Sequence, residues 1–256
     1  MEIPHILDEL AFDMGSLPRE AIEAAIAKKE KITPFLLEVL KEALMHLYDI
    51  IEHDNYQGHL YAMYLLAQFR EKQAFPLIIE LISFPGEIPH AILGDVLTED
   101  LSRILASVTG SDINPLKKVI EDSQLNEYVR AACQTALVTL VGCSLIPRRE
   151  AIDYFQLLFR GKMDRTPSFA WDNLISSACD LYPEELYPDI ERAFAEGLIE
   201  KSFISLEDVQ AILHEKREIH LFRLHQTAEL VDDTVTEMEK WASPYSNSED
   251  LYKFIK

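Results

Sequence analysis

The chain has 256 residues, of which 48% are hydrophobic and only 8 are glycine, so its composition suits a sizeable core and is not that of a disordered protein. It carries 44 acidic and 24 basic side chains, and this net charge of −20 disfavours binding to nucleic-acid phosphates or anionic lipid headgroups. No apolar run approaches the roughly 20 residues that span a bilayer, and the acidic N-terminus lacks the basic region of a signal peptide.

The N-terminal part of the chain is predicted to be helical. Residues 3–12 form a short apolar segment that would cap the first repeat of an array. A helix is expected to begin at Pro18, and the dipeptide Thr33-Pro34 is predicted to be the N-cap and first turn of the next helix. This helix would run to about residue 52, before a turn at residues 53–58.

The stretch from Leu60 to Phe84 shows the pattern that the rest of the chain repeats. Two apolar runs with i, i+3, i+4, i+7 spacing flank the charged and polar residues 70–73, which predicts an antiparallel helix pair. Both runs also carry apolar residues outside the main stripe. Each helix therefore has to be covered on more than one side, as in a stack of hairpins.

The middle of the chain begins with what is predicted to be its longest loop, Pro85 to Gly94. Asp95 is expected to cap the helix after this loop. Asn126 is expected to cap the most regular helix of the chain, which Gly142 would end. Later helices are predicted to begin at Pro147, Pro167 and Pro183.

The C-terminal part has a looser pattern. Ser205 and Asp208 form a start that resembles a capping box. From His214 to Lys240 the charge density rises, and the pattern is compatible both with one long helix and with a break near His214–Arg217. We expect a repeat array over residues 1–203, a helical extension packed on it over 204–242, and a flexible tail over 243–256.

Prolines recur near the start of the second helix of each pair. The steps from Pro34 to Pro76 and on to Pro115 are 76 − 34 = 42 and 115 − 76 = 39 residues, and the step to Pro188, 188 − 115 = 73, is close to twice that. This period is typical of HEAT and armadillo arrays. The sequence thus predicts an all-α protein, a right-handed α-solenoid of about five helical hairpins with a C-terminal helical extension.

The segment NEYVRAA from Asn126, followed by Ala136-Leu137, resembles the HEAT-like repeat of the phycobilisome-lyase type. Along residues 18–240 the chain also resembles a bacterial family of uncharacterised conserved proteins, with similar runs ITP, LLAQFRE and DDTV. The resemblance implies a helical repeat fold and no assigned activity. Some members carry a Cys-rich zinc tail of the SEC-C kind. Because no cysteine follows Cys179, we expect no such tail here.

One set of residues has helical spacing that could bind a metal. His214, Glu218 and His225 lie at i, i+4 and i+11, and helical His and Glu can ligate zinc. Solvated polar faces give the same spacing by chance. Cys133 and Cys179 could be nucleophiles, but each lies in an apolar stripe, where free cysteine is usually a small core residue.

Aromatic and arginine side chains are favoured anchors at protein interfaces. The helices assigned to the inner row carry five candidates for partner binding, of which the aromatic ones could equally be core residues: Tyr61, Tyr64, Arg103, Arg130 and Trp171.

These observations favour a non-catalytic protein–protein interaction scaffold without a cofactor. Its partner would present a basic or polar patch, and we expect no binding to nucleic acid or membranes. The odd, small number of cysteines, 3 in all, favours a reducing compartment, so we expect a cytoplasmic protein. The alternative is a metal-dependent or lyase-type enzyme that uses the residues around His214. A more remote alternative is an acidic mimic of nucleic acid. The sequence leaves the oligomeric state open.

Overall fold

The computed structural model describes residues 1–53, 55–110 and 112–241. In these residues the regular elements are 17 α-helices, one π-helical turn and one 3-10 turn, with no strand. The all-α prediction is confirmed. Within the same residues, no helix combines the length and apolar character that crossing a membrane requires.

The described residues form two compact units, and the first combines Met1–Phe69 with the segment from Val231 to Trp241. Ten of the twelve residues of its helix α5 are buried. This helix packs on α1, α2, α3 and α17, as expected for a helix that is apolar on most sides. The helices of this unit are α1 (Ile3–Ala11), α2 (Arg19–Ala27), α3 (Lys29–Met45), α4 (Leu47–Glu52), α5 (Gly58–Phe69) and α17 (Thr234–Trp241).

The second unit is the continuous segment Arg70–Leu230. Its elements up to the middle of the unit are α6 (Ala74–Ile82), α7 (Ile88–Leu93), α8 (Val96–Glu99), α9 (Leu101–Val108), α10 (Asn114–Glu121) and α11 (Glu127–Gly142). The remaining elements are α12 (Arg148–Leu157), η1 (Leu158–Lys162), α13 (Phe169–Asp180), η2 (Glu184–Leu186), α14 (Tyr187–Ala195), α15 (Leu206–Leu213) and α16 (Arg217–Thr227).

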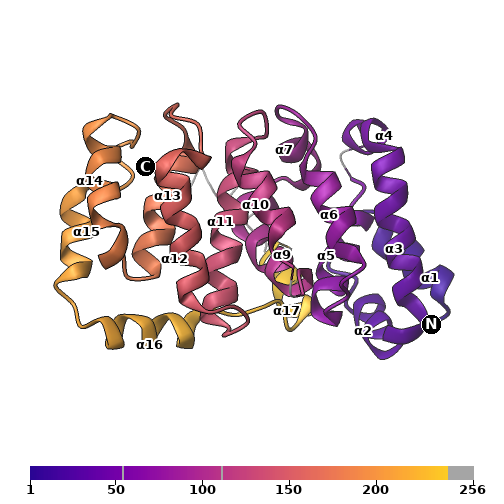
Figure 1. Cartoon of the computed structure of the whole chain (residues 1–256). Helices are drawn as coiled ribbons and strands as arrows, with labels where there is room; N and C mark the ends of the chain where they lie inside the picture. The colour runs from indigo at the N-terminus through magenta and orange to yellow at the C-terminus, as the bar shows by residue number, and fades with distance from the viewer. Residues whose placement is uncertain (54, 111, 242–256) are drawn as a thin grey trace, which may run out of the picture. The chain divides into compact units, whose positions relative to one another are not determined.

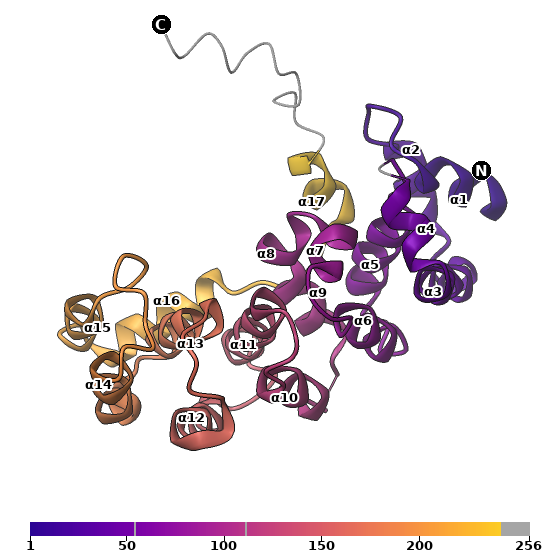
Figure 2. The same ribbon diagram turned by 90° about the horizontal axis from the view of Figure 1, so that it is seen from above.

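Most helices of the second unit form two rows. Figure 2 shows α6, α10, α12 and α14 on one side and α9, α11, α13 and α15 on the other. The central helix α11 packs on α9, α10 and α13. Its start is confirmed as predicted, because the Asn126 side chain accepts a hydrogen bond from the Tyr128 backbone N–H at 2.9 Å. Gly142 is its last residue, also as predicted.

The helix α16 runs across the ends of its neighbours rather than alongside them (Figure 1), and it contacts α11 and α13. The imidazole Nδ1 of His225 lies 2.7 Å from the carbonyl oxygen of Gly142. A Cβ atom added at Gly142 would lie only 2.3 Å from the Cβ of Ala228. The chain breaks between α15 and α16, so the one-long-helix alternative for residues 214–240 is wrong.

Two expected boundaries are also wrong. Thr33-Pro34 does not begin a helix but lies inside α3, which starts at Lys29. The Thr33 hydroxyl donates to the Lys29 carbonyl oxygen at 2.8 Å, and proline's fixed φ is compatible with a helix, so the turn continues although Pro34 has no N–H. The predicted loop from Pro85 to Gly94 contains α7, which begins with a proline in its first turn.

The two units group the chain differently from the expected division at residue 203. The segment 204–242 contributes α15 and α16 to the second unit and α17 to the first. The expected pair of helices between Leu60 and Phe84 is likewise divided, because α5 belongs to the first unit and α6 to the second. The predicted tail, residues 243–256, lies outside the described residues.

Candidate partner-binding surface

Three aromatic rings, two from the helices α11 and α13 and one from the loop before α15, meet at the surface of the second unit. Tyr128 and Phe169 have ring centroids 4.7 Å apart, and those of Phe169 and Phe203 are 5.3 Å apart. The exposed fractions are 39% for Tyr128 and 51% for Phe203. We call these three residues the aromatic row. Large apolar side chains that stay exposed side by side are typical of interaction surfaces.

Capping interactions explain why the rings meet. Tyr128 and Phe169 lie in the first turns of the neighbouring helices α11 and α13. The Phe169 backbone N–H donates to a carboxylate oxygen of Glu127 at 2.5 Å, so the first turn of α11 caps that of α13. Phe203 lies in the loop before α15, where the Glu200 backbone N–H donates to the Asp172 carboxylate at 2.7 Å.

A small cavity adjoins the aromatic row. Its volume is about 100 Å³. Its walls come from the four helices α8, α9, α11 and α13. The lining residues are Leu97, Thr98, Ser102, Tyr128, Ala131, Ala132, Thr135, Phe169 and Asn173. The small side chains of Ala131 and Ala132 leave this space open. The Asn173 amide holds one side by donating to the Ala131 carbonyl oxygen at 3.0 Å.

The charges beside the aromatic row are mainly negative. Glu127, Asp172 and Glu200 are tied to the backbone beside its rings, whereas Lys201 is the basic residue of the adjoining loop. Burial raises the pKa of the Asp172 carboxyl, and the hydrogen bond from the Glu200 backbone opposes that rise. This surface therefore suits a partner with positive charge.

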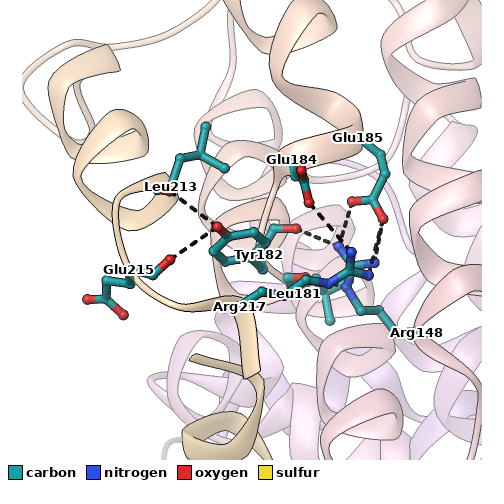
Figure 3. Close-up of polar contacts among 8 residues, drawn as sticks. All are labelled: Arg148, Leu181, Tyr182, Glu184, Glu185, Leu213, Glu215 and Arg217. Atoms are coloured by element: carbon teal, nitrogen blue, oxygen red, sulfur yellow. Dashed lines mark hydrogen bonds and ion pairs between the residues drawn. The ribbon is translucent and has the colours of Figure 1, made fainter. Parts of the chain in front are cut away.

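A second polar cluster joins the turn after α13 to the start of α16 (Figure 3). Arg148 donates to the carbonyl oxygens of Leu181 and Tyr182 at 2.5 Å each, and to both carboxylate oxygens of Glu185 at 2.7 Å. The Tyr182 hydroxyl lies 3.2 Å from the carbonyl oxygens of Leu213 and Glu215. We call this cluster the Arg148 junction.

The backbone at the Arg148 junction is strained. Tyr182 has a φ of 62°, in the left-handed region that usually holds glycine after a helix. Both faces of this turn are held, by Arg148 through the carbonyl groups and by the α15–α16 connection through the Tyr182 hydroxyl. The side-chain and main-chain groups of the Arg148 junction form hydrogen bonds with one another. The role of the Arg148 junction is therefore to fix the conformation of the turn after α13.

The neighbouring α16 histidine His220 extends this cluster. Its Nε2 lies 3.1 Å from the Asp180 carbonyl oxygen and its Nδ1 lies 3.4 Å from the Glu215 carboxylate. Burial raises the pKa of the Asp180 carboxyl, and the positive charge of His220 opposes that rise. The Asp180 residue is solvent-exposed, so water offsets part of the effect of burial.

The five residues predicted to contact a partner are buried or paired with other residues of the chain. Tyr64 and Trp171 have 0% exposure, and Tyr61 has 5%. Arg130 is paired with Asp164 at 2.8 Å, and Arg103 with Asp100 at 3.1 Å. Partner binding through these five side chains stays a prediction, and the burial of the three aromatic rings favours the alternative that they are core residues.

The three candidate metal ligands do not come together on one helix. His214 caps the end of α15, with its Nδ1 2.6 Å from the Gln210 carbonyl oxygen, whereas Glu218 and His225 belong to α16. The spacing argument fails because the chain breaks between them. Across the described residues, no group of three or more His, Cys, Asp or Glu side chains has the arrangement of a metal site.

The two cysteines weighed as nucleophiles are buried. Burial raises the pKa of the Cys133 thiol, and it raises the pKa of Cys179 to about 12. Because the thiolate is the reactive form, both side chains are poor nucleophiles at neutral pH.

Comparison with known proteins places the chain among its relatives. The family described as "Protein of unknown function (DUF1186)" matches residues 1–245. The chain belongs to this family. A DUF1186 relative from Chlamydia muridarum (strain MoPn / Nigg), described as an uncharacterized protein, is 57% identical over 94% of this chain and 97% of its own length.

A second similar protein comes from Chlamydia trachomatis serovar D and is also described as uncharacterized. It is 56% identical over 94% of this chain and 96% of its own length. No solved structure matches this DUF1186 chain. The bacterial family resemblance expected from the sequence agrees with these relatives.

Proposed function

We propose that this DUF1186 protein is a non-catalytic scaffold that binds a protein partner with a basic surface. The observation that supports this proposal is the aromatic row, because three adjoining rings with two of them well exposed offer anchors of the kind that dominate protein interfaces. The carboxylates of Glu127, which accepts the Phe169 N–H, and of Glu200, which accepts the Ser202 N–H, favour a positively charged partner. Because Cys133, Cys143 and Cys179, all among the described residues, form no disulfide, we infer a reducing compartment, the cytoplasm.

The finer architecture belongs to this proposal. The two rows of helices in the second unit are compatible with stacked hairpins, and we infer that residues 1–203 form a right-handed α-solenoid that is followed by a helical extension. Small-angle scattering on the purified protein is expected to give a radius of gyration above the ~18 Å of a compact chain of this length. A value at the compact limit would contradict the solenoid.

Partner capture tests the role of the aromatic row. The tagged full-length protein, the double variant Tyr128→Ala/Phe203→Ala and the control Phe222→Ala are each used to capture proteins from cells of its own species, followed by mass spectrometry. Phe222 is a suitable control because it is 62% exposed but lies on α16. We expect the affinity of the double variant for a specific partner to fall at least about 30-fold, since two interface anchors each contribute about 1–2 kcal/mol.

The recovered partner then allows a kinetic check. Opposite charges across an interface chiefly raise the association rate, and salt screens them with a Debye length of about 8 Å near 0.15 M. The association rate is expected to fall as salt rises while dissociation changes little. Equal recovery by the double variant, or association that is independent of salt, would contradict the proposed function.

A further inference from the structure

We propose that the cavity and the aromatic row together bind an extended segment of the partner, which places a short aliphatic side chain in the cavity and a neighbouring Lys or Arg over the exposed rings. This inference rests on the proposed function and specifies the chemistry that the partner must present.

The size and lining of the cavity select the first side chain. About 100 Å³ is the space of about three water molecules at ~30 Å³ each, which admits a short side chain but not an aromatic one. None of the nine lining residues is charged, and Leu97, Ala131 and Ala132 make much of the wall apolar. An aliphatic group that replaces poorly held water in such a space gains affinity.

Three of the polar side chains at the cavity, those of Thr98, Thr135 and Asn173, already bond to the protein itself. The Asn173 amide nitrogen lies within 3.0–3.3 Å of the Ala131 carbonyl, the Gln134 amide oxygen and the hydroxyls of Thr135 and Ser177. The Thr98 hydroxyl donates to the Asp95 carbonyl oxygen at 3.2 Å. The cavity is therefore expected to bind an apolar side chain of matching shape more tightly than a charged one.

The charges around the aromatic row select the second side chain. The positive ends of the α11 and α13 dipoles point towards this surface, which by itself would favour an anion. Asn126 and Glu127 already accept first-turn N–H groups of these two helices, so that site is filled by the protein's own oxygens. What remains open is an aromatic surface beside carboxylates, and a cation is attracted both to ring faces and to carboxylates.

Selection from a phage-displayed library of random decapeptides on the full-length protein tests which side chains this surface binds. Selection on the wild type is expected to enrich peptides with Lys or Arg next to Val, Ile or Leu. A synthetic peptide of the enriched sequence should bind at least ~10-fold more weakly to each of two variants that fill the cavity, Ala132→Leu from its wall and Thr98→Tyr from its exposed mouth. Binding to Phe222→Ala should be unchanged.

Two different filling variants are used so that misfolding of one of them cannot account for weaker peptide binding. Ala132 is only 8% exposed, so its replacement can disturb packing, whereas Thr98 is an exposed residue whose replacement leaves the core intact. Replacing the basic residue of the peptide by Gln should remove the salt dependence of association.

Three results would overturn the inference: no enrichment, enriched peptides that are acidic or lack a basic residue, or unchanged binding by both filled variants. The proposed function would survive each of them if capture of a native partner still depended on Tyr128 and Phe203. Loss of that dependence would instead remove the scaffold proposal itself.

Discussion

Replacing Arg148 by Met is expected to lower the free energy of unfolding by about 2–4 kcal/mol at neutral pH. Methionine fills similar space but donates no hydrogen bond, so the carbonyl groups of Leu181 and Tyr182 would lose a partner in a turn that already has an unfavourable φ. The contact with Glu185 contributes the smaller part, because its side chain is 39% exposed and solvent screens the charges. Urea unfolding followed by circular dichroism measures the loss.

The Glu185 part of this effect is expected to disappear in acid. The hydrogen bond from Arg148 lowers the pKa of the Glu185 carboxyl from 4.5 to about 2. Because the pKa is lower in the folded protein, the ion pair stabilises the fold fully above pH 4.5 and this contribution is lost as the pH falls towards 2. The difference between wild type and Arg148→Met should therefore shrink over that window.

The neighbouring arginine provides a matched control for this experiment. Arg149 is 89% exposed and its contact is with Asp153 in the next turn of the same helix, so Arg149→Met should change stability by less than about 0.5 kcal/mol. Equal effects at both arginines, or a difference between wild type and Arg148→Met that grows in acid, would show that the Arg148 junction does not hold this turn.

Replacing Gly142 by Ala is expected to detach α16 from the end of α11 and to lower stability by about 1–3 kcal/mol. The added Cβ would lie 2.3 Å from the Ala228 Cβ, which is too close for both to remain in place. It would also lie 3.3 Å from Leu224 side-chain atoms, a tight contact that a small shift relieves. The displacement would also break the contact between His225 and the Gly142 carbonyl group. Hydrogen exchange of the α16 amides should accelerate while exchange in α12 stays unchanged.

A compensating substitution separates this steric effect from a general loss of helix stability. Ala228→Gly removes the Cβ atom that the new alanine would meet, so the double variant Gly142→Ala/Ala228→Gly should recover most of the protection of α16. If the double variant is no better than Gly142→Ala alone, close packing between these two residues is not what holds α16.

Helix starts that depend on local chemistry were predictable from the sequence. The Asn126 cap and the Ser205–Asp208 capping box both form, because each needs only a side chain and the next turn of backbone. The prediction of a helix start at Thr33-Pro34 was wrong because it, too, depended on local chemistry alone. The local pattern of a helix start is also compatible with a helix interior once a hydroxyl donates to the carbonyl group four residues earlier.

The candidate site was much less predictable. Tyr128 has the position of an ordinary first-turn residue, and only the capping of Phe169 by Glu127, 42 residues earlier in the chain, brings the rings together. Periodicity indicates which face of a helix is apolar, but not which neighbour covers it. Trp171 and Tyr64 were therefore reasonable anchors by residue type, yet both have 0% exposure. The signal available in the sequence was an aromatic residue within two positions of each N-cap: Tyr128 near Asn126, Phe169 near Ser168 and Phe203 near Ser205.

The composition of the first compact unit has a consequence for biosynthesis. Its helix α17 packs on α2 and α5, and the Thr234 backbone N–H donates to the Gln68 side chain at 2.9 Å. These two residues are 166 positions apart in the sequence. The flank of α5 that α17 covers therefore stays uncovered until Thr234 and the rest of α17 have been synthesised. The segment Arg70–Leu230 is continuous, so all of its residues have been synthesised before α17 is made, although Arg103 still bonds the late Glu229 and Leu230 carbonyl groups. Nascent chains therefore expose the flank of α5 to chaperones and proteases until translation passes residue 241.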